Sequence, residues 1–471
     1  MLHVSTRGEA PAIGFTDALL TGLARDGGLY VPEAFPGLTP SAIAAFAGLP
    51  YAAVAERVLS PLIGDEIAAP DLSGMIAQAY SGFRHAAVCP ISQVGDNLFV
   101  LELFHGPTLA FKDVAMQLLG RLMDHALRQR GTRATIIGAT SGDTGSAAVE
   151  AFRGLSQVDV FILYPHGRVS EVQRRQMTTV AAPNVHAIAI EGTFDDCQAL
   201  VKAMFNHARF RDELLLSGVN SINWARVAAQ AVYYFTAAVS LGAPHRPVSF
   251  AVPTGNFGDI LAGWIAMRMG LPIGRLMIGT NANDILVRAL STGSYQIQGV
   301  EPTTSPSMDI QVSSNFERLL FEAYGRDAGA IRRLMGGLAQ AGRFDIDAGP
   351  LERIRSEFAA TSVDEPGVAS EIRDVHRTTG MIVDPHTAIG TRAGRRLLEQ
   401  DPSIPVVALA TAHPAKFPEA VERATGVRPA LPPHLEDLLS REERFTVLPH
   451  DQARVERFVR ERARAARGVA A

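Results

Sequence analysis

Residues 135–147 read Thr135-Ile136-Ile137-Gly138-Ala139-Thr140-Ser141-Gly142-Asp143-Thr144-Gly145-Ser146-Ala147. This order is a short apolar run, a glycine-rich loop and the beginning of a helix. The same order returns at Val248–Met269, where a second apolar run leads into another glycine-rich loop and another helix. Units of this kind, with strands that are apolar throughout, predict an α/β fold with parallel sheets covered by helices on both faces.

Strand and helix signals also alternate along the rest of the chain after residue 90. The predicted strands are Leu98–Leu103, Val158–Leu163, Val185–Ile190, Leu276–Ile278 and Val406–Ala410. The predicted helices are Val169–Val180, Phe194–Asn206, Trp224–Leu241, Asp284–Leu290 and Glu419–Ala424. Residues 1–90 are mostly helical in pattern and punctuated by proline. We therefore expect a helical N-terminal extension over 1–90, an α/β lobe over 91–220 and a larger α/β lobe over 221–471.

The first glycine-rich loop joins the end of a predicted strand to the start of a predicted helix. Backbone N–H groups and the helix dipole hold anions at such a place. The hydroxyl groups of Thr140, Ser141 and Thr144 add donors suited to a carboxylate or a phosphate. The glycine spacing matches neither G-x-G-x-x-G nor G-x-x-x-x-G-K-[ST], so the loop has neither the dinucleotide nor the Walker A pattern.

The second loop, Gly255-Asn256-Phe257-Gly258, also follows a strand and opens a helix. Gly255 and Gly258 allow the backbone to approach a ligand closely, and we expect Asn256 to take any left-handed dihedral angles. Ligands of α/β folds bind beyond the carboxyl ends of the strands. The second loop is therefore a predicted phosphate site.

Lys112 lies in the segment His105–Asp113, between a predicted strand and a predicted helix. Gly106-Pro107 turns the chain, and Thr108 is the expected N-cap of a helix over Leu109–Met123. This arrangement puts Lys112 in the first turn of the helix, where the helix dipole disfavours an ammonium.

Two further features single out Lys112. The neighbouring Leu109 and Phe111 would desolvate the amine, which lowers a lysine pKa, and a Schiff-base lysine must be neutral to react. The chain has only three lysines, Lys112, Lys202 and Lys416, and otherwise uses arginine, which cannot lose its proton. Lys112 is therefore the candidate catalytic residue, against the commoner case of a solvated lysine at the start of a surface helix.

Composition excludes several other classes of protein. The net charge of −4 gives no attraction to nucleic acid or to an anionic membrane. Cys89 and Cys197 lie far apart with no CxxC, so we expect neither a disulfide framework nor a metal site. There is no signal-peptide pattern and no apolar run of about 18 residues. We expect a cytoplasmic monomer or homodimer that binds a small molecule.

A Schiff-base lysine, a phosphate loop and a second anion loop together match the requirements of pyridoxal 5′-phosphate (PLP). The lysine would hold the aldehyde, the loop Gly255–Gly258 the cofactor phosphate, and the loop around Ser141 the carboxylate of an amino acid. PLP is therefore the predicted cofactor.

Five motifs stand in order along the chain. They are H-G-P-T-L-A-F-K-D (His105–Asp113), T-S-G-D-T-G-S-A (Thr140–Ala147), N-W-A-R (Asn223–Arg226), P-T-G-N-F-G-D (Pro253–Asp259) and T-A-H-P-A-K-F (Thr411–Phe417). Together they resemble the threonine synthase family, and more narrowly its long bacterial and fungal branch. The resemblance implies a two-lobed, tryptophan-synthase-like (fold type II) PLP enzyme, a lyase that converts O-phospho-L-homoserine and water into L-threonine and phosphate.

The resemblance also implies residue roles at the cofactor. Lys112 would carry the cofactor and shuttle protons, and the backbone N–H groups of Gly255–Gly258 would bind its phosphate. The hydroxyl of Thr411 would bind the pyridine nitrogen. Asp143 stands where many relatives of this fold carry asparagine, and it is expected either beside the ring oxygen of the cofactor or as a cap within its own loop.

For the substrate, the resemblance implies contacts from the first loop. The residues concerned are Thr140, Ser141, Gly142 and Thr144. The leaving phosphate needs cationic or hydroxyl donors, and the candidates are Lys416, Arg168 and the cluster Ser313–Asn315. His105 and His413 are candidate proton carriers, against the commoner case of a packed histidine.

Two alternative functions remain at this point. A PLP-dependent phospholyase would eliminate phosphate from the same substrate and release a 2-oxo acid with the same cofactor residues. A noncatalytic metabolite-binding protein on this scaffold is a more distant alternative, and the presence of Lys112 argues against it. Dehydratases and cystathionine synthases fit less well because they show an S-x-K lysine context, whereas Phe111 precedes Lys112.

Overall fold

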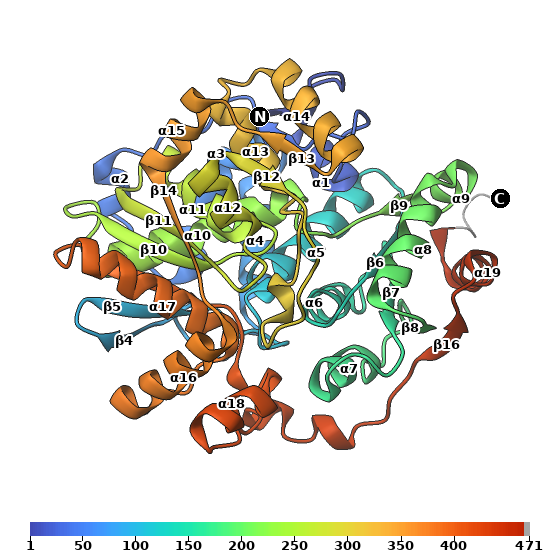
Figure 1. The fold of residues 1–471 in the computed structure, drawn as a ribbon. Helices are drawn as coiled ribbons and strands as arrows, with labels where there is room; N and C mark the ends of the chain where they lie inside the picture. The colour runs from blue at the N-terminus through green and yellow to red at the C-terminus, as the bar shows by residue number, and fades with distance from the viewer. Residues whose placement is uncertain (466–471) are drawn as a thin grey trace.

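The computed structural model describes residues 1–465, in which two mostly parallel sheets form the centres of two lobes (Figure 1). The larger sheet has the strand order β14-β11-β10-β15-β5-β4, and only β4 is antiparallel to its neighbour. Its strands are β4 (Ile91–Gly95), β5 (Leu98–Glu102), β10 (Val248–Pro253), β11 (Ile273–Thr280), β14 (Phe358–Ser362) and β15 (Val406–Ala410). The predicted α/β class is confirmed.

The second sheet is parallel in every pair and has the order β16-β8-β7-β6-β9. Its strands are β6 (Ala134–Ala139), β7 (Val158–Pro165), β8 (Val185–Glu191), β9 (Leu216–Ser217) and β16 (Thr446–Pro449). Helices α8 (Phe194–Asn206), α9 (Ala208–Glu213) and α19 (Gln452–Arg462) cover one of its faces, and α6 (Asp143–Phe152) lies against the other.

Apolar side chains point to both faces of each sheet, as buried parallel strands require. Along β15, Val406, Ala408 and Ala410 pack on the side of α17 (Pro385–Gln400), while Val407 and Leu409 face α10 (Trp224–Ser240) and α11 (Gly258–Arg268). Helices α10, α11 and α5 (Lys112–Gln129) belong to one apolar core that continues from the larger sheet to the smaller one. This shared core joins the two lobes through α5.

Residues 1–90 contain four helices and a small antiparallel sheet. The helices are α1 (Phe15–Thr21), α2 (Pro40–Ala44), α3 (Tyr51–Ile63) and α4 (Ala69–Tyr80). The sheet consists of β1 (Leu2–Ser5), β2 (Ile13–Gly14) and β3 (Tyr30–Pro32). The extension packs into the same apolar core as α5 and α10 and is not a separate unit.

The sheets take strands from both sides of the lobe boundary expected at residue 220. β4 and β5 lie in the larger sheet although they precede the boundary, and β16 lies at the edge of the smaller sheet although it follows it. After α18 (Pro418–Thr425) the chain crosses from one lobe to the other and ends with β16 and α19 (Figure 1). The division of the sequence into consecutive lobes does not include this crossing, because the segment between Gly426 and Arg444 has no regular helix or strand pattern.

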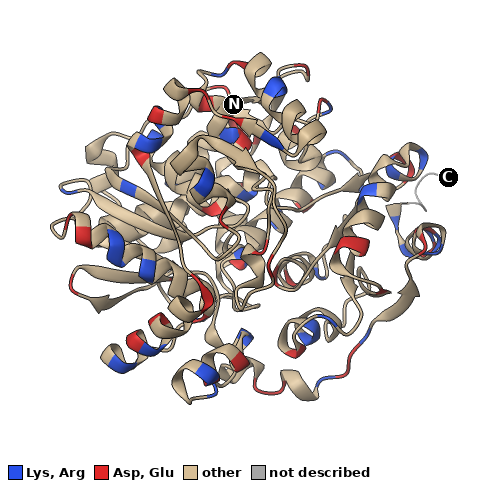
Figure 2. Cartoon of the chain, in the orientation of Figure 1, with Lys and Arg blue, Asp and Glu red and all other residues tan. Residues whose placement is uncertain are grey.

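The remaining helices and strands complete the outer layer. They are α7 (Glu171–Thr178), α12 (Ile285–Thr292), β12 (Ser294–Gln296), α13 (Phe316–Ala323), α14 (Ala328–Ala341), β13 (Arg343–Asp345), α15 (Ala348–Glu357) and α16 (Glu365–Thr379), with short 3-10 turns such as η3 (Pro414–Lys416). Acidic and basic residues are intermixed on the outer helices (Figure 2). Within residues 1–465, no helix has both the length and the apolar character needed to cross a membrane.

Candidate active site

Lys112 is the first residue of α5 and is only 8% exposed. The chain before it is bound to the end of β15, because the N–H of Phe111 donates to the carbonyl of Thr411 at 2.8 Å and the N–H of His413 donates to the carbonyl of Leu109 at 3.0 Å. Leu109 takes a left-handed conformation, with φ of 62°, to make this turn. Lys112 is therefore buried in the first helical turn, as predicted, and placed by the strand beside it.

The prediction that Thr108 caps this helix is wrong. The cap position is Phe111, and Thr108 lies one turn earlier. The N–H and the hydroxyl of Thr108 donate instead to the two carboxylate oxygens of Asp113, at 2.7 and 2.6 Å. A Cβ atom at Gly106 would lie 2.5 Å from the Cβ of Asp113, so only glycine fits there. The Gly106 turn and Asp113 together fix the loop that leads to Lys112.

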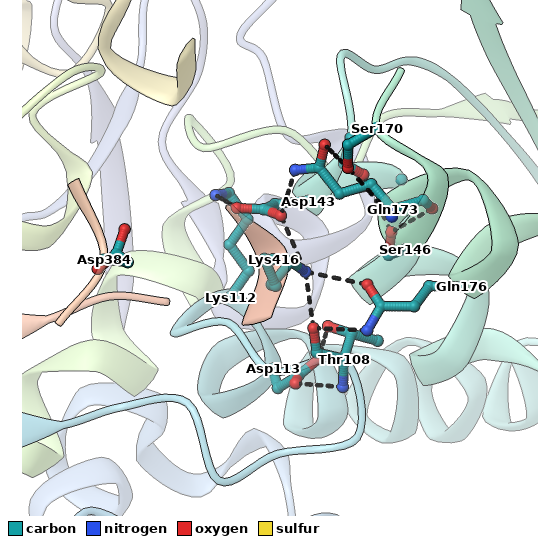
Figure 3. A network of polar contacts seen from close by, with 12 residues as sticks. Thr108, Lys112, Asp113, Asp143, Ser146, Ser170, Gln173, Gln176, Asp384 and Lys416 are labelled. Carbon is teal, nitrogen blue, oxygen red and sulfur yellow. Dashed lines mark hydrogen bonds and ion pairs between the residues drawn. The ribbon is translucent and has the colours of Figure 1, made fainter. Parts of the chain in front are cut away.

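Asp143 lies between two of the three lysines of the chain (Figure 3). Its Oδ1 atom is 2.9 Å from Nζ of Lys416 and accepts the side-chain N–H of Gln173 at 2.8 Å. Its Oδ2 atom is 3.4 Å from Nζ of Lys112. All of these side chains are buried, and Asp143 does not cap its own loop.

The charges of this cluster determine its protonation. Burial acts to raise the pKa of Asp143, but the charges of Lys416 and Lys112 and the bond from Gln173 hold that pKa well below its usual range. Burial lowers the pKa of the Lys112 ammonium; Asp143 opposes this effect, while Lys416 and Arg226 add to it. Asp143 is therefore an anion, and Lys112 is an amine with a weakened hold on its proton.

The first glycine-rich loop is closed by its own residues. The hydroxyl oxygen of Thr140 accepts the N–H groups of Gly142 and Gly145, at 3.0 and 2.9 Å. A Cβ at Gly142 would lie 2.4 Å from the side chain of Gln173, so glycine is required where Gln173 reaches Asp143. Among the described residues, the hydroxyl groups of Ser141 and Thr144 have no hydrogen-bond partner. Thr140 thus holds the loop, and Ser141 and Thr144 are the donors left for an anion.

The second loop presents unused backbone donors at the start of α11. Within residues 1–465, no group accepts a hydrogen bond from the N–H of Gly255, Asn256 or Phe257. The carbonyls of Gly255 and Asn256 are bound by the side chains of Ser313 and Asn315, at 2.6 and 3.0 Å. The left-handed residue is Phe257, with φ of 64°, and not Asn256 as expected. Three free N–H groups at a helix N-terminus fit a phosphate.

Thr411 and His413 follow β15 directly. Among the described residues the hydroxyl of Thr411 has no hydrogen-bond partner, which leaves it available to a ring nitrogen. Burial, with a contribution from the charge of His105, lowers the pKa of His413 to about 4, and its Nδ1 accepts the N–H of Ala415 at 3.2 Å. His413 is therefore a neutral, packed residue, the commoner of the two cases considered for it.

Several candidates for binding the substrate phosphate already use their donors within the chain. Lys416 donates to the carbonyl of Thr108 at 2.7 Å, to Gln176 at 3.0 Å and to Asp143, so all three of its N–H groups are used. In this arrangement Lys416 has no free N–H group for a substrate. Ser313 and Asn315 bind the phosphate loop, and Arg168 is an exposed residue after β7.

Arg226 is the residue that sequence reasoning missed. It lies on α10 among apolar residues, is 3% exposed, and its guanidinium donates to the carbonyl of Val219 at 2.8 Å. Its Nε has no partner among the described residues. Burial lowers the pKa of Arg226 to about 10, so it remains a cation. A single arginine in the apolar run Trp224–Leu241 was the available signal.

A second buried carboxyl lies behind the phosphate loop. Asp259, in the first turn of α11, accepts the hydroxyl groups of both Tyr233 and Tyr234 at Oδ1, the latter at 3.0 Å. Its Oδ2 has no partner among the described residues. Burial raises the pKa of Asp259 to about 6, although the tyrosine bonds and the charge of Lys112 act in the opposite direction. A buried carboxyl with one bare oxygen is suited to carry a proton.

We expect the substitution Asp259→Asn to remove part of the pH dependence of stability. A carboxyl with a raised pKa stabilises the fold fully below its unfolded value of 3.8, and this contribution is lost as the pH rises through about 6. Between those limits the original protein should lose on the order of 2 kcal/mol of unfolding free energy that the variant does not lose. Urea unfolding of both proteins at pH 4 and pH 7 measures the difference. An equal loss in both would show that Asp259 does not titrate there.

These groups converge as a PLP site requires. The buried lysine suits the aldehyde of the cofactor, and the helix N-terminus with three free N–H groups suits its phosphate. The free hydroxyl at the end of a strand suits the ring nitrogen, and the other loop, with its free hydroxyl groups, suits the substrate. The residues present therefore fit the cofactor.

Comparison with known proteins agrees with this class. A family model described as "Pyridoxal-phosphate dependent enzyme" matches residues 89–412. Two others, "Threonine synthase N terminus" and "Threonine synthase, C-terminal", match residues 2–80 and 387–459. The fold and the site thus define a PLP-dependent enzyme of fold type II.

Individual relatives narrow the class to one family. The chain is 54% identical to the threonine synthase of Pseudomonas aeruginosa over 98% of both chains, and 42% identical to that of Saccharomyces cerevisiae over 90% of this chain and 89% of the other. The crystal structure of PLP-bound threonine synthase from Brucella melitensis has 61% identity and a TM-score of 0.97, and the match covers 98% of this chain and all of that one. The chain belongs to the threonine synthase family. The expected cofactor, PLP, and the expected lyase function as a threonine synthase are confirmed.

Proposed function

We propose that this chain converts O-phospho-L-homoserine and water into L-threonine and phosphate at the site around Lys112. The observation that carries the proposal is the buried Lys112 amine, whose pKa is lowered by burial and which faces an anion, Asp143, already bound by another lysine. Membership of the threonine synthase family supports the same reaction.

In this proposal the residues of the chain divide the work. Bound PLP supplies an electron sink that stabilises negative charge on the carbon atoms next to the substrate amino group. Lys112 would hold the aldehyde and would take and return protons at Nζ. The N–H groups of Gly255, Asn256, Phe257 and Gly258 would bind the cofactor phosphate, and the Thr411 hydroxyl would bind the pyridine nitrogen.

The substrate would be held at its two charged ends. Ser141, Gly142 and Thr144 would bind the carboxylate at the N-terminus of α6, where a helix dipole favours an anion. Arg226 would bind the phosphate, since its charge is buried and its Nε is unpartnered. Asp143 would face the ring oxygen of the cofactor from the side of Lys112.

The experiment that tests the reaction is product analysis. The purified protein is incubated with O-phosphohomoserine, and phosphate, threonine and 2-oxobutyrate are quantified. Equal amounts of phosphate and threonine support the proposal. Phosphate with 2-oxobutyrate would assign the phospholyase reaction instead.

We also propose that the enzyme works in the cytoplasm as a monomer or homodimer, without a nucleic-acid or membrane partner. The intermixed surface charge and the net charge of −4 support this proposal (Figure 2). Light scattering of the purified protein tests the oligomeric state.

A further inference from the structure

Lys416 is fully buried, and it is one of only three lysines in the chain. Its Nζ donates to the carbonyl of Thr108, to Oε1 of Gln176 and to Oδ1 of Asp143 (Figure 3). Burying an ammonium is unfavourable unless it has an ionic partner. Asp143 is that partner, and it is also the carboxylate next to Lys112.

The two lysines contact Asp143 unequally. Lys416 lies 2.9 Å from Oδ1, whereas Lys112 lies 3.4 Å from Oδ2. Gln173 donates to the same Oδ1 as Lys416, at 2.8 Å, and is itself held by the hydroxyl of Ser170 at 3.0 Å. The charge of Asp143 is therefore balanced mainly by Lys416. Its Oδ2 atom makes only a long contact with the second cation, Lys112.

We propose that Lys416 is a positioning residue. By binding Oδ1 it neutralises most of the charge of Asp143, so that the Lys112 ammonium has no counter-ion of its own. Lys112 can then lose its proton at neutral pH and serve as the nucleophile and base that the proposed function requires. The inference rests on that function in its assignment of Lys112.

Three other charged or titratable groups lie near the cluster. They are Arg226 on α10 and Asp259 on α11, with Asp113 on α5 facing Lys416. Arg226 disfavours a second cation. Burial raises the pKa of Asp113 to about 6, although its bonds from Thr108 and the charge of Lys416 act in the opposite direction. None of these groups replaces Lys416 at Oδ1 of Asp143, so its removal should be felt directly at Lys112.

When the cation at position 416 is removed, Asp143 should become the counter-ion of Lys112. The intrinsic proton affinities of an amine and a carboxyl differ by about six pH units, so the shared proton would stay on Lys112. In Lys416→Met and in Lys416→Gln, which keeps a donor for the carbonyl of Thr108, the pH midpoint for losing the Lys112 proton should rise by about one unit or more. Asp143→Asn should move it in the acid direction.

The test measures the amine itself in the full chain freed of cofactor. The rate of acylation of Lys112 by an amine-selective reagent is followed by mass spectrometry from pH 6 to pH 10, with the exposed Lys202 as internal standard. We expect acylation at pH 7 to be about tenfold slower in Lys416→Met, and to return toward the original rate in Lys416→Met/Asp143→Asn. The pH profile of kcat/KM of the cofactor-loaded enzyme should shift in the same direction, and Lys202→Gln should leave that profile of kcat/KM unchanged.

An unchanged Lys112 midpoint in Lys416→Gln or Lys416→Met would overturn the inference and leave Lys416 a purely structural residue of the Thr108 loop. If neither variant folds, Asp143→Asn decides alone, and the absence of an acid shift would overturn it. Failure of the proposed function would look different: the cofactor would be attached to a residue other than Lys112, or the product would be 2-oxobutyrate in place of threonine.

Discussion

Lys112→Ala should abolish covalent attachment of the cofactor and reduce kcat by about 10³-fold or more. The variant lacks the lysine whose Nζ lies 3.4 Å from Asp143 of the first loop and whose charge acts on Asp259 beside the second. In the proposed function it therefore lacks both the nucleophile and the proton carrier of the reaction. Lys416 cannot take over, since its three N–H groups are bound to Thr108, Gln176 and Asp143. Reduction with borohydride, followed by peptide mapping, measures the attachment, and a product assay measures kcat.

The matched control for this variant is Lys202→Ala. Lys202 lies on α8 and is exposed, so the substitution removes a lysine without touching the site. It should retain full attachment and full activity. A reduced cofactor found on Lys202 or Lys416 in the original protein, or an active Lys112→Ala variant, would refute the assignment of Lys112.

The fold was predictable because its strands and loops carry local signals. Each glycine-rich loop follows an apolar strand and precedes a helix, and this order alone indicates parallel sheets with ligands at the carboxyl ends of the strands. The crossing of the C-terminal segment was not predictable. β16 is a short edge strand that pairs with β8, more than 250 positions earlier in the chain, and such pairing leaves no periodic signal between the two.

Of the site, the backbone features were predicted and the side-chain partnerships were not. The phosphate loop and the position of Lys112 follow from glycines and from the start of a helix. The roles of Thr108 and Lys416 depend on which acceptors the fold brings within 3 Å of them, and those acceptors, Asp113 and Asp143, belong to different elements. Single-sequence reasoning named Lys112, Asp143 and Lys416, which the fold brings together, but could not identify their partners.

The same limit hid Arg226, whose importance arises from burial and from the absence of a partner. Both are properties of the folded chain, because an arginine in an apolar helix is as often a surface residue whose stem covers apolar neighbours. In the structure, α10 places Arg226 in the interior within electrostatic reach of Lys112, with a single hydrogen bond to Val219. A buried cation that keeps an unused donor is the strongest indication of where the substrate phosphate binds.

Arg226→Met should lower kcat/KM for O-phosphohomoserine by about 10²–10⁴-fold, because truncating one partner of a buried charge pair costs about 3–5 kcal/mol. Methionine keeps much of the apolar stem, so packing against the rest of α10 is preserved and the effect reports the lost charge. Arg226→Lys should recover part of the loss, since an ammonium keeps the charge without the forked geometry of a guanidinium.

Steady-state kinetics give kcat/KM, and borohydride trapping confirms that the cofactor is still attached at Lys112. Inhibition by inorganic phosphate should weaken in parallel in Arg226→Met. A variant with normal kcat/KM and normal phosphate inhibition would place the substrate phosphate elsewhere, whereas loss of cofactor attachment would show that Arg226 serves the cofactor rather than the substrate.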